Sequence, residues 1–355
     1  MNKVKLGQLV SIQTGKLDAN AAVFGGKYPF FTTAKEISRI NEYAYDGEVV
    51  LVAGNGDLNV KYYKGKFNAY QRTYILTSNS NVRMKYLYYF LDKYIEVLRY
   101  QSIGGVIKYI KLNNLSDAQI PMRSIFEQDK IIGILEKLDN EIIIRSKQLS
   151  ELSNLVKSRF NEMFGSKKFD KVSISELVDD RIETAKKIFD QHDTIKYIDI
   201  SSIDNKNYKM TGFQEYMLDQ APSRAQQHIR KGDIVVSTVR PNLKNIAMTE
   251  LDDENLVASS GFCVLRALKC LPEYLFAIIC SDRFTNKMAN IVTGANYPAI
   301  KSSDIMNYIV PLPPIQLQNE FADFVAQVDK SQLAIQKSLE ELETLKKSLM
   351  QEYFG

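Results

Sequence analysis

The sequence predicts an α+β fold, in which two tandem globular α/β domains are separated by two long antiparallel coiled-coil helices with pseudo-two-fold symmetry. Two observations predict this arrangement. A stretch of the chain is repeated near its end, and each copy of the repeat carries a long apolar pattern with heptad spacing. Outside the repeat, short β-branched runs lie between Gly, Asn and Asp residues, which is typical of strands joined by turns.

The repeat is long and ungapped. Residues 104–165 align with residues 294–355 at 17 identical positions of 62, and both copies end in Phe-Gly. A looser similarity lies upstream, where residues 47–50 match residues 232–235. Because chance is a poor explanation for a match of this length, we interpret the chain as a tandem duplication of a globular lobe followed by a helix.

The duplication predicts four segments along the chain. They are a first domain at 1–125, a central helix at 126–165, a second domain at 166–312 and a C-terminal helix at 313–355. Prolines precede both helices, and the glycine of each Phe-Gly pair marks their ends. With about 38 residues at 1.5 Å each, either helix is roughly 57 Å long.

Both helices carry an apolar seam that advances in steps of three and four residues, as in coiled coils. The seam positions are Ile131, Leu135, Leu138, Ile142, Leu149 and Leu152 in the first copy, and Phe321, Val325, Val328, Ile335, Leu339 and Leu342 in the second. Arg145 and Gln332 interrupt the seams and are candidates for fixing the register. We expect the two seams to pair with each other; the alternative is a coiled coil between two chains.

The expected elements of the lobes follow from the local pattern. The clearest strands are Val49–Val52, Tyr74–Thr77, Ile234–Val239 and Cys263–Leu265, and the expected helices are Lys85–Tyr100 and Pro272–Met288. The intervals between the strands are irregular, and loops that bind a partner would lie there.

Charge is distributed unevenly along the 355 residues. Residues 1–125 hold 17 Lys and Arg against 9 Asp and Glu, together with 13 of the 20 tyrosines, whereas the whole chain carries a net charge of +4. A basic, tyrosine-rich lobe suits a nucleic-acid partner, because it neutralises phosphates. A basic surface without a specific partner would look the same.

Cysteine usage and hydropathy indicate a cytoplasmic protein. Cys263, Cys270 and Cys280 are odd in number and lack CxxC spacing, so a disulfide scaffold or a zinc knuckle is not expected. The first residues contain no apolar run typical of a signal peptide, and no segment has the roughly 20 apolar residues of a membrane span. We therefore expect no membrane association.

No catalytic motif is recognisable, so the sequence does not predict an enzyme. There is no Gly-x4-Gly-Lys-Ser/Thr loop for ATP, no Asn/Asp-Pro-Pro-Tyr/Phe segment of an amino-methyltransferase, and no Pro-Asp…Asp/Glu-x-Lys nuclease motif. His192 and His228 are the only histidines, and neither has a Cys or Glu at ligand spacing. We expect both histidines at the surface or in loops, and no metal site.

Two glycine-containing segments at equivalent places of the repeat are candidates for binding phosphates. They are 104–108 and 294–298, where glycine allows close approach of the backbone. The candidate residues of these segments and their surroundings are Lys108, Lys111, Asn296, Tyr297 and Lys301. A plain turn before a strand is the alternative reading.

A second pair of segments, 53–59 and 237–244, follows the strand that the two lobes share. The segments differ between the lobes although the framework repeats, as expected if each lobe reads a different ligand. Amide and guanidinium groups match the edges of adenine and guanine. The candidates here and in neighbouring turns are Asn55, Asn59, Gln71, Arg72, Arg224, Arg240, Asn242 and Lys244. Asn-Gly and Pro-Asn are also ordinary turn dipeptides.

In order, these segments resemble those of the specificity subunits of type I restriction-modification enzymes. The second half has Gly-Asp-Ile-Val-Val-Ser-Thr at 232–238, Ser-Gly-Phe at 260–262 and Pro-Leu-Pro-Pro-Ile-Gln-Leu-Gln at 311–318. The first half has Lys-Tyr-Pro-Phe at 27–30 and Phe-Glu-Gln at 126–128. The resemblance covers essentially the whole chain.

This resemblance implies a division of labour between subunits. The two domains would be target-recognition domains that read the two parts of a bipartite, asymmetric site in double-stranded DNA, and the helices would be the spacer between them. Two methyltransferase (M) subunits would dock on the chain and methylate adenine with S-adenosylmethionine. Restriction and translocation (R) subunits would use ATP and Mg²⁺. All these cofactors would belong to the partners and none to this chain.

Two other functions remain open from the sequence. One is a specificity module of a related system whose partner is a fused methylase-nuclease. The other is a coiled-coil interaction protein without a role on DNA. A self-sufficient nuclease or methylase is disfavoured by the missing motifs.

Overall fold

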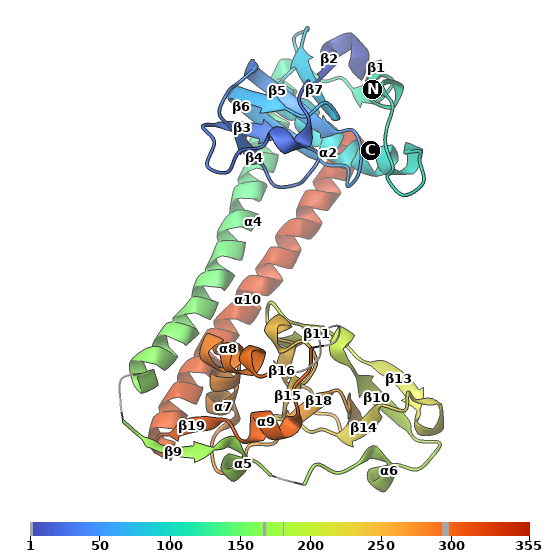
Figure 1. Ribbon diagram of the computed structural model, residues 1–355. Helices are drawn as coiled ribbons and strands as arrows, with labels where there is room; N and C mark the ends of the chain where they lie inside the picture. Colours follow the sequence, from blue (N-terminus) through green and yellow to red (C-terminus); the bar gives the residue numbers. More distant parts are fainter. Residues whose placement is uncertain (1–2, 166–167, 180, 293–297) are drawn as a thin grey trace. The chain divides into compact units, whose positions relative to one another are not determined.

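A computed structural model describes residues 3–165, 168–179, 181–292 and 298–355. The chain divides into two compact units. Unit 1 comprises Met1–Gln148 with Ile335–Gly355, and unit 2 comprises Leu149–Ala334. Each unit therefore combines one lobe with a part of both long helices (Figure 1).

The lobe of unit 1 is built on a six-stranded sheet with the order β2-β7-β5-β6-β3-β4. All neighbouring strands are antiparallel except β3 and β6. The strands are β2 (Val10–Thr14), β3 (Tyr28–Phe31), β4 (Ser38–Ile40), β5 (Tyr45–Ala53), β6 (Val60–Ala69) and β7 (Thr73–Ser78). The predicted strands Val49–Val52 and Tyr74–Thr77 are confirmed, as part of the buried second half of β5 and as part of β7.

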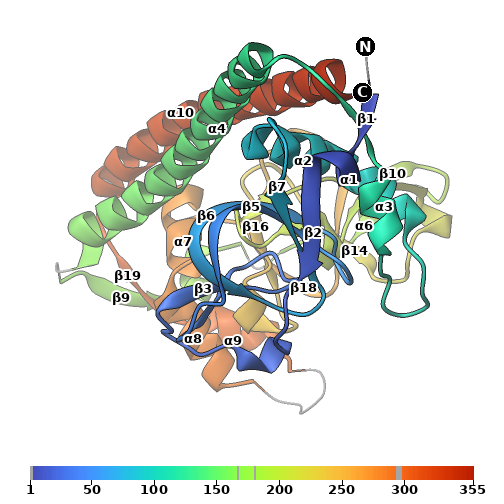
Figure 2. The same cartoon turned by 90° about the horizontal axis from the view of Figure 1, so that it is seen from above.

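Helices and a small second sheet complete this lobe. The strands β1 (Lys3–Lys5) and β8 (Gln119–Pro121) pair with each other. The helical elements are α1 (Leu6–Leu9), η1 (Ala19–Ala21), α2 (Met84–Gln101) and α3 (Leu112–Ser116). The helix predicted at Lys85–Tyr100 is confirmed as α2, which packs on β5 and β6 (Figure 2).

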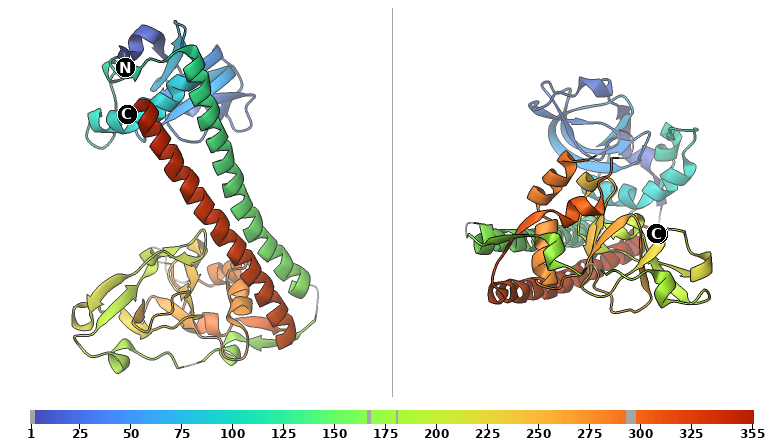
Figure 3. Two further views of the ribbon diagram at one scale, coloured as in Figure 1. Left: turned by 180° about the vertical axis from the view of Figure 1, so that it is seen from behind. Right: turned by 60° about the horizontal axis from the view of Figure 1, so that its bottom comes forward.

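The lobe of unit 2 contains several smaller sheets (Figure 3). A four-stranded sheet has the order β13-β10-β17-β14, a three-stranded sheet has the order β16-β15-β18, and β11-β12 and β19-β9 are pairs. The strands are β9 (Asp170–Ser173), β10 (Thr194–Ile198), β11 (Ile203–Asp204), β12 (Lys209–Met210), β13 (Gln214–Met217), β14 (Ala225–His228), β15 (Ile234–Ser237), β16 (Ile246–Met248), β17 (Leu256–Ser259), β18 (Phe262–Leu265) and β19 (Ile309–Leu312). The predicted strand at Cys263–Leu265 is confirmed, and the one at Ile234–Val239 ends two residues early, at Ser237.

The helical elements of this lobe are short. They are α5 (Ile174–Leu177), α6 (Ala185–Ile188), η3 (Ile200–Ser202), η4 (Leu218–Gln220), η5 (Pro241–Leu243), α7 (Pro272–Ile279), α8 (Asp282–Asn290) and α9 (Ser302–Met306). The single helix predicted at Pro272–Met288 is wrong, because α7 ends at Ile279 and α8 starts anew. The Ser281 hydroxyl accepts the Phe284 N–H and thus caps α8, so this polar residue marks a boundary.

The surface position expected for both histidines holds for only one of them. The side chain of His192 is 84% exposed. His228 is buried at the end of β14, and its Nε2 lies 3.0 Å from the carbonyl oxygen of Glu254. The expectation for His228 is therefore wrong, since this ring is part of the lobe's packing.

The two long helices are α4 (Ile125–Phe160, 36 residues) and α10 (Ile315–Phe354, 40 residues). A π-helical turn, η2 (Asn161–Gly165), follows α4. Every seam position named above is buried or half-buried, whereas most residues between them are exposed.

Within each unit, side chains of α4 contact side chains of α10. In unit 1, Lys346 Nζ lies 2.6 Å from an Asp139 oxygen. In unit 2, Gln332 donates to the Ser153 hydroxyl at 3.1 Å, and the rings of Phe160 and Phe321 are 5.5 Å apart. Gln332 thus bonds to the facing helix, while the Arg145 side chain bonds to Gln148 of its own helix.

The start of each long helix is fixed to its lobe by a buried glutamine at a matched position of the repeat. Buried Gln128 accepts the Arg83 N–H at 3.0 Å, and buried Gln318 accepts the Leu271 N–H at 2.8 Å. Each glutamine also donates to a carbonyl oxygen five residues earlier in the chain. These bonds satisfy amide groups that burial would otherwise leave unpaired.

The end of α10 and the turn η2 that follows α4 each pack on a lobe through a phenylalanine. Phe354 lies against Tyr86 in unit 1, with ring centroids 5.1 Å apart, and Phe164 lies against Tyr274 in unit 2 at 5.0 Å. Both tyrosine hydroxyls donate to a proline carbonyl oxygen at 2.6 Å. Each lobe is therefore completed by the phenylalanine that ends one copy of the repeat.

Candidate nucleic-acid interface

In unit 1, backbone hydrogen bonds join the segment after β5 to the segment before α3. Ile110 donates its N–H to the Gly54 oxygen at 2.9 Å, and Gly56 donates to the Lys108 oxygen at 2.9 Å. An isolated bridge pairs Asn55 with Tyr109 between them. The two segments that the sequence indicated separately in this lobe are thus neighbours.

The turn between β6 and β7 joins the same place. Gly54 donates its N–H to the Arg72 oxygen at 2.8 Å. Gln71 and Arg72 form this turn, and both side chains are exposed. The Tyr74 hydroxyl donates to the Ile110 oxygen at 3.2 Å, and burial raises the pKa of Tyr74, so it remains a neutral donor that holds the two segments together.

Unit 2 repeats this arrangement with different residues. Ile300 donates its N–H to the Thr238 oxygen at 2.9 Å, and Arg240 donates to the Pro298 oxygen at 2.8 Å. An isolated bridge pairs Val239 with Ala299. The segment after β15 therefore lies beside the segment before α9, as the segment after β5 lies beside the one before α3.

Arg240 takes the place that Gly56 has in unit 1, and both have a left-handed backbone, with φ of 49° and 71°. A non-glycine residue in this conformation costs about 1–2 kcal/mol. Lys244, at the other end of η5, is also left-handed, with φ of 54°. The side chains of Arg240 and Asn242 are exposed at this bend.

Arg224 adjoins this place through the turn between β17 and β18. Ser260 donates its N–H to the Arg224 oxygen at 2.8 Å, and Thr238 donates to the Gly261 oxygen at 3.0 Å. The Arg224 side chain is exposed.

Two candidates have side chains that are engaged within the lobes. The Asn59 amide donates to the oxygens of Thr33 and Asp57 at 2.8 and 2.9 Å. Lys244 forms an ion pair with Asp282 of α8. These contacts favour structural roles for both residues, and the sequence pattern alone does not distinguish such roles from binding.

Lys111 and Lys301 occupy matched positions directly before α3 and α9. Their backbone N–H groups donate to Asn114 and Asp304 at 2.7 and 2.8 Å, and both lysine side chains are exposed. Asn296 and Tyr297, the remaining candidates, lie outside the described residues.

The sequence interpretation missed the apolar side chains at this place. Val106 is fully exposed and Ile107 is 63% exposed, next to Lys108. The sequence contains a signal for them, because two aliphatic residues follow two glycines in a segment that is otherwise typical of an exposed turn.

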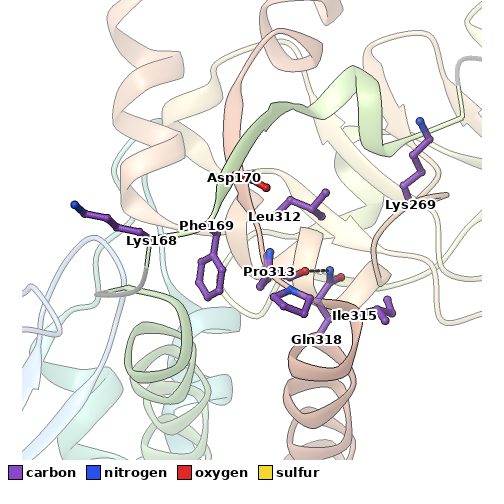
Figure 4. Close-up of a pocket in the computed structure, with 9 residues that line it drawn as sticks. Lys168, Phe169, Asp170, Lys269, Leu312, Pro313, Ile315 and Gln318 are labelled. Carbon is purple, nitrogen blue, oxygen red and sulfur yellow. Dashed lines mark hydrogen bonds between the residues drawn. The ribbon is translucent and has the colours of Figure 1, made fainter.

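Two cavities in the part of the chain that the structure describes contain no candidate residue. One, of about 580 Å³, lies in unit 2 at the start of α10, where Lys168, Phe169, Asp170 and Gln318 are among the lining residues (Figure 4). The other, of about 420 Å³, lies in unit 1, and Lys85 forms an ion pair with Glu136 there. The candidate interface is thus a surface of loops.

Among the residues that the structure describes, no group of three or more His, Cys, Asp or Glu side chains is placed to hold a metal ion. Burial raises the pKa of Cys263 and of Cys270 to about 11, so both remain thiols near neutral pH. In the same parts of the chain, no helix combines the length and apolar character needed to cross a membrane.

Comparison with known proteins identifies the family. The model of the type I restriction modification DNA specificity domain matches residues 1–154 and, a second time, residues 166–345. The chain belongs to this family. It is a DNA-binding specificity subunit with two specificity domains of mixed α/β structure and a long helix. Such subunits are the recognition components of type I systems and not their catalytic ones.

Relatives of this specificity subunit match it over nearly its whole length. It is 27% identical to the type I restriction enzyme EcoDI specificity subunit of Escherichia coli, covering 99% of this chain and 87% of the relative. It is 23% identical to the MjaVIII specificity subunit of Methanocaldococcus jannaschii, covering 98% and 90%. The fold is similar to that of the type I restriction-modification S subunit from M. genitalium, with a TM-score of 0.64 at 16% identity, covering 100% and 96%.

Proposed function

We propose that each lobe reads one part of a bipartite, asymmetric site in double-stranded DNA. In unit 1 the reading surface consists of Asn55, Gln71, Arg72, Lys108 and Lys111. In unit 2 it consists of Arg224, Arg240, Asn242, Lys301 and the segment with Asn296 and Tyr297. Arginine and amide side chains suit base edges, and lysines suit phosphates.

The observation that carries this proposal is the matched pairing of segments in the two lobes. Ile110 bonds to Gly54 in one lobe and Ile300 bonds to Thr238 in the other, both at 2.9 Å. The backbone is therefore held alike, while the residues at matched positions differ between the lobes. Half-buried Asn55 and exposed Gly56 lie on one side, and half-buried Val239 and exposed Arg240 lie on the other. A repeated frame with different side chains is what two readers of different sequences require.

We further propose that α4 and α10 pair as an antiparallel coiled coil related by a pseudo-two-fold axis, and that this spacer sets the gap between the two half-sites. The contacts Asp139–Lys346 and Ser153–Gln332 support this pairing, because their residue numbers rise on one helix as they fall on the other. In this view the domains lie at 1–125 and 166–312, and the spacer helices at 126–165 and 313–355.

The proposed partners supply the chemistry. Two methyltransferase subunits would dock on this chain and use S-adenosylmethionine, and restriction subunits would use ATP and Mg²⁺. This chain would carry no cofactor of its own and would act in the cytoplasm.

Methylome sequencing tests the proposal. Cells that express the methyltransferase partner are compared with and without this chain, and with a chain in which the unit 1 segment 54–59 is replaced by that of another specificity subunit. We expect one bipartite motif that depends on this chain, and a change in only one half of that motif for the exchanged segment. A motif without a gap, or no chain-dependent methylation, would contradict the proposal.

The alternative function, a coiled-coil interaction protein without a role on DNA, is tested by a separate measurement. The purified complex is bound to duplexes with and without the mapped motif at increasing salt. Recognition predicts a preference for the motif and a steep loss of affinity with salt. Salt-insensitive behaviour without a preference would favour a protein-interaction role.

A further inference from the structure

The hairpin Ile103–Tyr109 of unit 1 presents aliphatic side chains to solvent at its tip. Val106 is 103% exposed and Ile107 is 63% exposed, and Ile103, Tyr109 and Leu112 are also counted among the exposed hydrophobic residues. Exposed apolar groups that cluster on one short segment usually mark a surface that another molecule covers.

The hairpin is held rigidly at its base. Ile103 and Tyr109 exchange two backbone hydrogen bonds of 3.0 and 2.9 Å. Gly104 has a φ of 116°, which a side chain would disfavour, and a Cβ there would lie 2.5 Å from the Ile107 oxygen. The bridge between Asn55 and Tyr109 then fixes the hairpin to the proposed reading surface. The base of the hairpin is therefore fixed, which reduces the ordering that binding through the tip requires.

The charges around the tip favour nucleic acid as the molecule that covers it. Arg72, Lys108 and Lys111 are exposed and form no ion pair within the part of the chain that the structure describes. Three cations on the hairpin and on the segments bonded to its base match a duplex, whose phosphates flank an apolar stack of bases. Proteins that deform DNA often place aliphatic side chains between base pairs in this way.

We propose that Val106 and Ile107 form a wedge that inserts between two base pairs of the half-site read by unit 1 and kinks the duplex there. This inference rests on the proposed function, since it requires that unit 1 binds DNA. Insertion unstacks a base step, and pyrimidine–purine steps unstack most readily. The lobe would thus select a flexible step at a position where no side chain reads a base edge.

The test measures DNA bending by the complex of the full chain with its methyltransferase partner. The duplex carries the mapped motif and a fluorophore at each end, so that energy transfer reports the end-to-end distance. The wedge variant combines Val106→Ser with Ile107→Ser, and a rescue variant combines Val106→Leu with Ile107→Leu. The matched control combines Val23→Ser with Phe24→Ser, two adjacent exposed apolar residues beside β4 of the same lobe, where Val23 donates its N–H to the Arg39 oxygen.

We expect the wedge variant to lose the bend and to bind the motif roughly tenfold more weakly, with unchanged affinity for unrelated duplex. The rescue variant and the control should bend DNA like the wild type. A wedge variant that bends the duplex fully, or a control that loses the bend equally, would overturn the wedge.

Other outcomes separate this inference from the proposed function. If the wild-type complex prefers the motif but does not bend it, the wedge is wrong and recognition stands. If the wild-type complex shows no preference for any motif, the proposed function itself fails. If the wedge variant loses its methyltransferase partner during purification, the hairpin tip contacts that protein and not DNA. The DNA wedge is then wrong.

Discussion

Arg240 shows how a single residue adapts the shared frame of the two lobes. It holds a left-handed backbone where unit 1 has Gly56, and its exposed side chain lies three residues after the shared strand. Such backbone strain at a non-glycine residue is a frequent feature of binding sites. The position therefore combines a backbone suited to glycine with a side chain suited to guanine.

Arg240→Gly should weaken recognition without weakening the fold. Glycine adopts the left-handed backbone at no steric cost, so we expect an unchanged or slightly raised unfolding midpoint. Loss of one base contact costs about 1–3 kcal/mol, so the half of the motif read by unit 2 should relax at one base pair and bind about tenfold more weakly. Methylome sequencing and duplex titration measure both effects, with Lys231→Ala as an exposed control in the same lobe. An unchanged motif at unchanged affinity would show that Arg240 reads no base.

Phe164 and Phe354 are the residues that complete the two lobe cores, and their rings are 4% and 7% exposed. Truncation of a buried phenylalanine to alanine typically costs 3–5 kcal/mol, so about that loss of unfolding free energy is expected for each variant. Phe126→Ala is the matched control, because Phe126 is 80% exposed at the start of α4.

Hydrogen exchange locates these losses in the structure. Phe354→Ala should speed amide exchange in α2, which carries Tyr86, and Phe164→Ala should speed it in α7, which carries Tyr274. Equal exchange in both helices for both variants would contradict the assignment of one phenylalanine to each core.

Among the helices and strands, the local sequence pattern predicts those whose residues show the composition or spacing of one element. The strands within β5 and β7 follow from β-branched runs between turn residues, and the helix α2 follows from helical spacing. The break between α7 and α8 did not, because Ser281 looks like one polar residue within a helix until its hydroxyl is seen to cap α8. His228 was misjudged for the related reason that a single ring has no periodicity.

The arrangement of the candidate interface is even less predictable from the sequence, because it depends on contacts between distant segments. Its residue types were recognisable, but the bonds from Ile110 to Gly54 and from Ile300 to Thr238 join backbone groups more than 50 residues apart in the chain. No side-chain pattern encodes them. Asn59 and Lys244 look like readers of DNA in the sequence and are bonded within the lobe in the structure. Their chemistry could be read from the sequence, and their surroundings could not.

The hairpin of unit 1 allows a matched test of an element. Gly104→Ala forces a side chain into a backbone with φ of 116° and against the Ile107 oxygen, whereas a Cβ at Gly105 would meet nothing within 4 Å. Strain of about 1–3 kcal/mol is expected for the first variant and little for the second. Gly104→Ala should therefore weaken motif binding several-fold and lower the unfolding midpoint by a few degrees, whereas Gly105→Ala should do neither. Equal affinity of both variants for the motif would show that the hairpin takes no part in DNA binding.

For the whole molecule, the spacer proposal makes a geometric prediction. Removing residues 142–148 and 337–343 takes one heptad from each helix and preserves the seams and the contacts Asp139–Lys346 and Ser153–Gln332. Seven residues at 1.5 Å shorten the spacer by about 10 Å, or roughly three base pairs at 3.4 Å. Three base pairs also rotate one half-site by about a third of a turn relative to the other. We therefore expect methylation of the original motif to be lost, and any new motif to keep both half-sites with a gap about three base pairs shorter.

A deletion in only one helix is the informative companion to this variant. Removing residues 142–148 alone leaves α10 at full length, so the Asp139–Lys346 and Ser153–Gln332 contacts cannot both persist. If the paired helices set the gap, this variant should lose methylation altogether, whereas the double deletion retains a folded, shorter spacer. Methylome sequencing of both strains decides the matter. A gap of unchanged length in the double-deletion strain would mean that the distance between half-sites is set by the partner subunits and not by α4 and α10.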